Sequence, residues 1–301
     1  MFVAQQNTTT ATNVVSLLPT SQYLVLDVET RDAPESAIEE AINLWKPGAN
    51  SKTAQEINAD ADKAIATWRA PINIKDPAKI EERRKNSLEN IELARQAALT
   101  KLEERKQEAI ANIRSRSALL DAAPIMCIGV QTQDGAVVFN GMDSTEYSLP
   151  NVRCVSCGNE RDMLIAFRQW VEIYTNTDTW LVGHNIKGFD LPKLRSAFMR
   201  WKLKLPAVLA PKVLAEQQLV VDTAALFRSF SVEHRDDFCP SLSTMCASLG
   251  IPAPKGVMTG SDMPGMYRAG WYLEILTYNA IDVAATTRAY LLMSGQASDL
   301  E

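Results

Sequence analysis

Four acidic residues lie where predicted strands and helices begin or end. Asp27 and Glu29 are two positions apart at the end of an apolar run, so both side chains project from the same face of a strand. Asp190 follows a second short apolar run and opens a predicted helix. Tyr278 and Asp282 have the i, i+4 spacing that places two side chains on one helix surface. We therefore expect one cluster of four carboxylates with a phenol beside it.

Four carboxylates repel one another unless cations neutralise them. Oxygen donors without histidine or cysteine favour hard divalent ions, so we expect two Mg²⁺ or Mn²⁺ ions. Two such ions about 3.5–4 Å apart suit in-line attack on a phosphodiester. Each acidic segment alone could be ordinary surface; Asp190, for example, could simply favour the positive end of a helix dipole. Their joint occurrence on suitable elements predicts a metal-dependent phosphodiesterase.

The elements that must position these residues follow from apolar runs and breaker residues. Strands are predicted at residues 23–28, 125–131, 136–140, 180–183 and 218–222, and helices at 161–174, 191–202, 241–249 and 270–292. This order predicts an α/β fold, a mixed five-stranded sheet flanked by helices, within a single domain spanning residues 1–301.

Residues 35–121 form a helical insertion between the first and second strands. Residues 79–118 contain neither Gly nor Pro and predict a helix of roughly 60 Å. Shorter helices are expected at 35–44 and 52–68. The long helix has only a thin apolar stripe, so it pairs with the shorter helices or with a second chain. The sequence is compatible with two interpretations of this insertion: a solvated helical hairpin, or a contact surface for nucleic acid or a partner protein.

The chain is acidic, with a net charge of −5 and a pI near 5.3. This charge argues against a protein that coats duplex nucleic acid, but a nuclease with an acidic metal site remains compatible with it. Residues 1–20 lack the features of a signal peptide, and no apolar run is long enough to span a membrane. We expect a soluble, cytoplasmic protein without a membrane partner.

The five cysteines do not form a convincing zinc site. Cys154 and Cys157 have the spacing of half a site, but six residues separate Cys239 from Cys246 rather than two. We interpret the first pair as ordinary residues of a strand or loop.

Three segments resemble the exonuclease motifs of the DEDDy 3′–5′ exonucleases. These segments are LVLDVET at 24–30, GHNIKGFD at 183–190 and YNAID at 278–282. The family is ribonuclease-H-like and includes the proofreading domains of DNA polymerases. Residues 241–251, with Lys255, Gly260 and Trp271, are similar to family-B-polymerase-like stand-alone exonucleases. The resemblance covers about 23–30 and 125–292 and leaves out the insertion.

The resemblance assigns the tyrosine subclass and a role to each matched residue. Thr277 stands where the histidine subclass has its histidine. The family pattern implies that Asp27 bridges two cations. It also implies that Glu29 and Asp282 hold the cation next to the attacking water, and that Asp190 holds the other. Tyr278 would position the water or the phosphate, because a phenol with a pKa near 10 is a poor base.

The resemblance also implies substrate contacts. Asn185 and the backbone of Thr30 would contact the terminal nucleotide, whereas His184 and Lys255 are either substrate contacts or structural residues. We expect cleavage from the 3′ end of single-stranded DNA. An exoribonuclease of the same family and a non-catalytic helical accessory module are the alternatives. The chain length leaves no room for a polymerase domain, so proofreading would occur in trans, with residues 79–118 contacting a polymerase or other replication partner.

Overall fold

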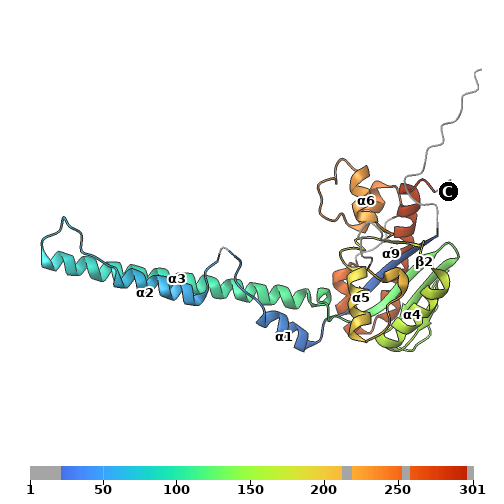
Figure 1. Ribbon diagram of the computed structural model, residues 1–301, viewed down its shortest axis with the longest axis horizontal. Helices are drawn as coiled ribbons and strands as arrows, with labels where there is room; N and C mark the ends of the chain where they lie inside the picture. The colour runs from blue at the N-terminus through green and yellow to red at the C-terminus, as the bar shows by residue number, and fades with distance from the viewer. Residues whose placement is uncertain (1–21, 50, 212–218, 253–257, 297–301) are drawn as a thin grey trace, which may run out of the picture. The chain divides into compact units, whose positions relative to one another are not determined.

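The computed structural model describes residues 22–49, 51–211, 219–252 and 258–296 (Figure 1). The chain divides into two compact units. The sheet unit comprises Met1–Asp32 and Asp121–Glu301, and the helical unit comprises Ala33–Leu120. Each unit has its own packing, and each is described separately below.

The sheet unit is built on one mixed sheet, whose strand order is β4-β3-β2-β1-β5-β6. The strands are β1 (Tyr23–Thr30), β2 (Ile125–Thr132), β3 (Gly135–Asn140), β4 (Arg153–Ser156), β5 (Trp180–Gly183) and β6 (Val220–Asp222). β1, β2 and β3 are antiparallel neighbours, whereas β5 runs parallel to β1, and β6 runs parallel to β5. The expected α/β fold of ribonuclease-H-like type is confirmed, with β1 in the interior of the sheet.

The described sheet has one strand more than the five expected from the sequence. The additional strand, β4, has only four residues, is partly exposed, and pairs in parallel with β3 at the sheet edge. Its sequence, RCVS, has no apolar alternation, so its pairing depends on β3 rather than on a local signal. Cys154 lies on this strand. The expected strand at 218–222 is β6, and residue 218 lies outside the described residues.

Helices cover both faces of the sheet. They are α4 (Glu160–Tyr174), α5 (Asp190–Arg200), α6 (Thr223–Phe230), α7 (Leu242–Ser248), α8 (Met263–Ala269) and α9 (Tyr272–Met293), with 3₁₀ turns at Ala207–Leu209 and Gly260–Asp262. The 3₁₀ turn at Ser117–Leu119 belongs to the helical unit. The four predicted helices of the sheet unit are confirmed to within two residues at each end. The short helices α6 and α8 were not predicted. α7 is equally short, but it was predicted because Ser241 caps it and Gly250 follows it. No described helix is both long and apolar enough to cross a membrane.

Successive side chains of β1 point to opposite faces of the sheet, so they pack against different helices. Leu24, Leu26 and Val28 belong to the core that includes residues of α4 and α5. Tyr23 and Val25 instead pack with residues of α9. Asp27 and Glu29 continue the second set, so a two-residue period carries them to the α9 face.

The helical unit contains α1 (Glu35–Asn43), α2 (Ala54–Ala66) and α3 (Pro77–Ser115). The long helix predicted at 79–118 begins two residues earlier. Pro77 is compatible with the first helical turn, where its missing N–H costs nothing, and the Asp76 side chain caps the helix by accepting from the N–H of Ala78 at 3.0 Å. None of the α3 residues is buried.

Polar contacts hold α2 and α3 as an antiparallel pair (Figure 1). Arg95 Nε donates to Asn58 Oδ1 at 2.7 Å, and Arg105 Nη1 donates to Ser51 Oγ at 2.9 Å. Residue numbers rise along α3 as they fall along the preceding segment, as an antiparallel hairpin requires. The insertion is therefore a helical hairpin held mainly by contacts at its surface.

Candidate active site

The acidic cluster forms where β1 and α9 meet. Ligand oxygens of Asp27, Glu29 and Asp282 all lie within 4.8 Å of one another. Glu29 and Asp282 are buried, and Asp27 is half-buried. The strand period of β1 supplies the first two, and α9 packs on the same face of the sheet and supplies the third. The sequence prediction that these three residues converge agrees with this geometry.

Asp190 approaches the cluster from the start of α5. Its Oδ1 accepts a hydrogen bond from the backbone N–H of Val28 at 3.0 Å, between Asp27 and Glu29 on β1. Asp190 is 2% exposed, and this burial raises its pKa to about 7 although two backbone hydrogen bonds act in the opposite direction. It is not part of the three-residue group above, but its charge raises the pKa of both Asp27 and Glu29.

The electrostatics of the cluster favour bound cations. Burial raises the pKa of Asp27 and of Glu29 well above the usual range, and repulsion from the neighbouring carboxylates raises both further. The donors are oxygens only, which suits Mg²⁺ or Mn²⁺ better than zinc. Buried and mutually repelling carboxylates with such a donor set fit a site for hard divalent ions.

Tyr278 lies one helical turn before Asp282 on α9. Its phenol is hydrogen-bonded to Asp282, and burial together with the charges of Asp282 and Glu29 raises its pKa beyond the usual range. The phenol therefore stays protonated at neutral pH. In this state Tyr278 can donate a hydrogen bond, but it cannot accept a proton as a general base.

Asn279 is a residue of this site that the sequence interpretation missed. Its Nδ2 donates to Asp27 Oδ2 at 2.7 Å and to the Asp27 carbonyl at 3.2 Å, and its side chain is fully buried. Gly129 lies opposite Asp27 on β2, and a side chain there would collide with Asn279 Oδ1. A glycine inside a strand signals a close approach of this kind, but the signal does not say what approaches.

His184 is engaged by protein groups at both ring nitrogens. Its Nδ1 is 3.1 Å from Thr223 Oγ1, and its Nε2 is 2.7 Å from the carbonyl oxygen of Pro240. Because a carbonyl only accepts, Nε2 carries the proton. Burial lowers the pKa of the ring, so it is neutral at physiological pH. A substrate contact would have to displace one of these partners, and the geometry favours a structural role.

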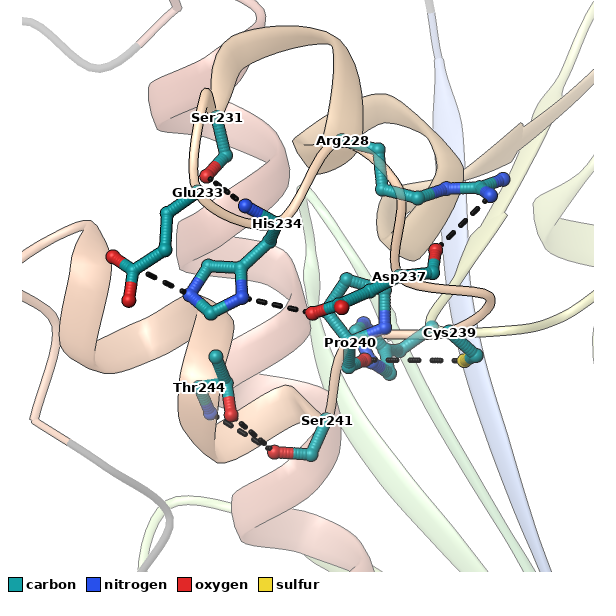
Figure 2. Close-up of polar contacts among 10 residues, drawn as sticks. Arg228, Ser231, Glu233, His234, Asp237, Cys239, Pro240, Ser241 and Thr244 are labelled. Carbon is teal, nitrogen blue, oxygen red and sulfur yellow. Dashed lines mark hydrogen bonds and ion pairs between the residues drawn. The ribbon is translucent and has the colours of Figure 1, made fainter.

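The loop that carries Pro240 is braced by polar contacts (Figure 2). Arg228 Nη1 donates to the carbonyl of Asp237 at 3.2 Å, and His234 Nδ1 contacts the Asp237 carboxylate at 2.8 Å. Ser231 accepts from the N–H of His234 at 3.0 Å. This loop therefore presents Pro240 to His184 in a defined position.

Asn185 adopts a left-handed backbone conformation, with φ of 59°. Asparagine tolerates this conformation better than most residues. The Asp222 carboxylate at the end of β6 stabilises it by accepting from the N–H of Asn185 at 3.0 Å. Asp222 also caps α6, accepting from the N–H of Ala224 at 3.1 Å. Asp222 is a second residue missed from the sequence, although an acid directly before a helix is a capping signal.

Of the two remaining predicted substrate contacts, the structure describes Thr30 but not Lys255. Thr30 is buried at the last position of β1, directly after an irregularity in the pairing of β1 with β2. The contact of its backbone with a terminal nucleotide stays a prediction. Lys255 lies outside the described residues.

Slightly more than half of the chain matches a known family. Residues 136–301 match the model of a family described as a predicted 3′–5′ exonuclease related to the exonuclease domain of PolB. The matched segment contains Asp190, Tyr278 and Asp282, whereas β1 with Asp27 and Glu29 precedes it. No curated protein matches the chain.

Proposed function

Because the chain belongs to the family of predicted 3′–5′ exonucleases related to the exonuclease domain of PolB, we propose that it removes nucleotides from the 3′ end of single-stranded DNA with two divalent cations. One observation carries the proposal: ligand oxygens of Asp27, Glu29 and Asp282 converge within 4.8 Å. Asp282 is far in the sequence from Asp27 and Glu29, so the convergence of all three residues is a property of the fold. Asp190, which electrostatically affects two of them, is the fourth proposed ligand.

Asp27, Glu29, Asp190 and Asp282 would hold Mg²⁺ or Mn²⁺. When bound, two such ions activate the attacking water and stabilise the leaving oxygen of a phosphodiester. The protein contributes a fixed arrangement of carboxylates. Asn279 restrains the Asp27 carboxylate, and the N–H of Val28 restrains that of Asp190.

Tyr278 would act as a hydrogen-bond donor to the attacking water or to an oxygen of the scissile phosphate. Its raised pKa supports this role, because a protonated phenol can stabilise developing negative charge and cannot remove a proton. Asn185 and the backbone of Thr30 are proposed to contact the terminal nucleotide, while His184 positions the neighbouring Asn185.

Single-stranded DNA is the proposed substrate because a frayed end enters a site between a sheet and helices without the cost of unpairing. The motifs contact metal and phosphate, so they do not distinguish the sugar. A panel of single- and double-stranded DNA and RNA, labelled at either end and supplied with Mn²⁺, tests the proposal. We expect stepwise loss from the 3′ end of single-stranded DNA. Undiminished degradation of a 3′-blocked strand would refute the polarity, and faster loss of RNA would reassign the substrate.

We further propose that the enzyme proofreads or repairs in trans, with residues 79–118 contacting a polymerase or other replication partner. The support is the family relation to the exonuclease domain of PolB, together with an exposed helix of 39 residues that buries none of its own side chains. Replacing residues 79–118 by a short linker tests this role. Unchanged partner binding and processivity in that variant would refute it.

A further inference from the structure

The end of the helical hairpin is a distinct surface in the helical unit. We define the hairpin tip as residues 67–85, which join α2 to α3 and include the first nine residues of α3. Because Arg95 pairs with Asn58 in an antiparallel register, the hairpin closes within this segment (Figure 1). The tip is therefore the turn of the hairpin, and its side chains have few neighbours to cover them.

The hairpin tip carries surplus positive charge although the whole chain has a net charge of −5. The tip contains six basic residues against the three acidic residues Asp76, Glu81 and Glu82. All six basic side chains are exposed. They are Arg69, Lys75, Lys79, Arg83, Arg84 and Lys85.

Most of this positive charge is not neutralised within the protein. Arg84 forms a long ion pair with Glu81 at 3.9 Å, and Asp76 is used as the cap of α3. The structure describes all of residues 67–85. The other basic side chains of the tip form no ion pair with any described residue. Their field therefore faces solvent and is available to an anionic partner.

A second basic run, residues 187–204, differs in this respect. Lys193 is buried, and Arg195 donates to a backbone carbonyl at 2.8 Å. Arg200 pairs with Glu160 at 2.7 Å. Half of the six cations in that run thus serve the internal structure of the sheet unit. In the hairpin tip, Arg69 donates to the carbonyl of Trp68 at 2.9 Å and Arg84 forms the long ion pair with Glu81. The other four tip cations make no such contact with the described residues.

An apolar side chain projects among the cations of the tip. Ile72 is fully exposed, at 100% of its accessible surface, and the nearby Trp68 is half-buried. Apolar side chains flanked by cations are used by nucleic-acid-binding proteins to contact bases while the cations bind phosphates. Ile72 has no packing role that explains its presence.

We propose that the hairpin tip binds the phosphate backbone of single-stranded nucleic acid, with Ile72 against a base or sugar. This inference rests on the proposed function, since nucleic acid is the polyanion on which the sheet unit would act. An acidic protein would also meet the positive charge. The fully exposed Ile72 among dispersed cations fits the alternating phosphates and bases of a nucleic-acid strand better than it fits an acidic protein. A direct binding measurement with single-stranded DNA distinguishes these two partners.

The test compares two full-length variants with the same change in charge. Lys75→Glu/Lys79→Glu alters the tip, and Lys101→Glu/Lys106→Glu alters two exposed lysines farther along the same helix. Binding of a fluorescent single-stranded DNA of about 30 nucleotides is measured by anisotropy in chelator, between about 0.05 and 0.3 M salt. Two lost phosphate contacts lower the salt slope by roughly 1.4, which corresponds to about 25-fold weaker binding at 0.1 M salt. The control variant keeps the wild-type slope.

Equal binding by the tip variant and the wild type would overturn the proposal, as would an equal loss in the control variant. Ile72→Ser should weaken binding without changing the salt slope, since it removes no charge. Hydrolysis of the p-nitrophenyl ester of thymidine monophosphate, which offers a single phosphodiester, reports on the carboxylate site alone. The tip variant should hydrolyse it at the wild-type rate. Failure of the wild type on this ester would count against the proposed function, and the chelator binding data would still decide the role of the tip.

Discussion

The amide of Asn279 on α9 donates to both the carboxylate and the carbonyl of Asp27 on β1, at 2.7 and 3.2 Å. These two hydrogen bonds tie the helix to the strand at the residue predicted to bridge two cations. The fully buried Asn279 packs against Gly129, which lies opposite Asp27 on β2. Three elements thus cooperate to fix one carboxylate.

Asn279→Ala should lower activity about 10- to 100-fold, mainly by weakening the affinity for Mn²⁺, because an unrestrained Asp27 carboxylate must be ordered at each binding event. Titrating activity with Mn²⁺ separates a weaker affinity for the ion from a lower rate at saturating Mn²⁺. We expect a raised Mn²⁺ requirement with partial recovery at saturation. An unchanged Mn²⁺ dependence would show that Asn279 is only a packing residue.

Gly129→Ala should produce the same defect by a different route. The added carbon would collide with Asn279 Oδ1 and lie 2.8 Å from Val283 Cγ2, so α9 must shift. Overpacking of this kind costs about 1–3 kcal/mol of unfolding free energy. Gly265→Ala is the matched control, because Gly265 is exposed in α8 and its nearest neighbour would be Arg268 Nη2 at 3.9 Å. The prediction fails if Gly129→Ala keeps both the wild-type melting temperature and the wild-type Mn²⁺ requirement.

Asp27→Asn and Asp282→Asn should each reduce the rate on single-stranded DNA by about 10³-fold or more, since bound divalent ions contribute several kcal/mol to such reactions. In chelator, the same variants should be as stable as the wild type or more stable, because a buried carboxylate repelled by its neighbours has been neutralised. Thermal melts and end-labelled oligonucleotides provide the two measurements. Asp134→Asn, in an exposed turn, is the control. Inactive variants that are also unfolded would not support a ligand role.

Tyr278→Phe should leave a slow residual activity, about 10- to 100-fold below the wild type, because one hydrogen bond to a charged group is lost. The Mn²⁺ requirement should stay the same. Since the phenol is protonated over the whole range from about pH 6 to 9, the shape of the pH–rate profile should also be unchanged. A profile that loses its acidic limb in the variant would instead assign Tyr278 a role as a base.

Local sequence patterns predicted which carboxylates share a face, because the repeats of a strand and of a helix span only a few residues. The two-residue period of β1 places Asp27 with Glu29, and the i, i+4 spacing on α9 places Tyr278 with Asp282. The contact of Asn279 with Asp27 depends on where α9 crosses the sheet and on the register of β2, which no local pattern encodes. β4 escaped prediction for a similar reason, because its four residues are strand only by pairing with β3.

The pKa of Asp190 predicts how the stability of the metal-free protein depends on pH. Burial raises this pKa to about 7 in the folded state, against about 3.9 for an unfolded aspartate, so the folded protein binds more protons between these values. Stability contributed by protonated Asp190 is therefore lost as the pH rises from about 4 to 7. The buried His184 acts in the opposite direction, because its lowered pKa disfavours the charged ring at low pH.

Comparing the wild type with Asp190→Asn isolates the aspartate, since both proteins retain His184. In chelator, the variant should melt only slightly above the wild type at pH 5 and several degrees further above it at pH 7.5. Saturating Mn²⁺ should reverse this order at pH 7.5, because only the wild type gains the full binding energy of the ion. A difference in melting temperature that is constant between pH 5 and 7.5 in chelator would contradict the raised pKa. A variant stabilised by Mn²⁺ as strongly as the wild type would show that Asp190 is not a ligand.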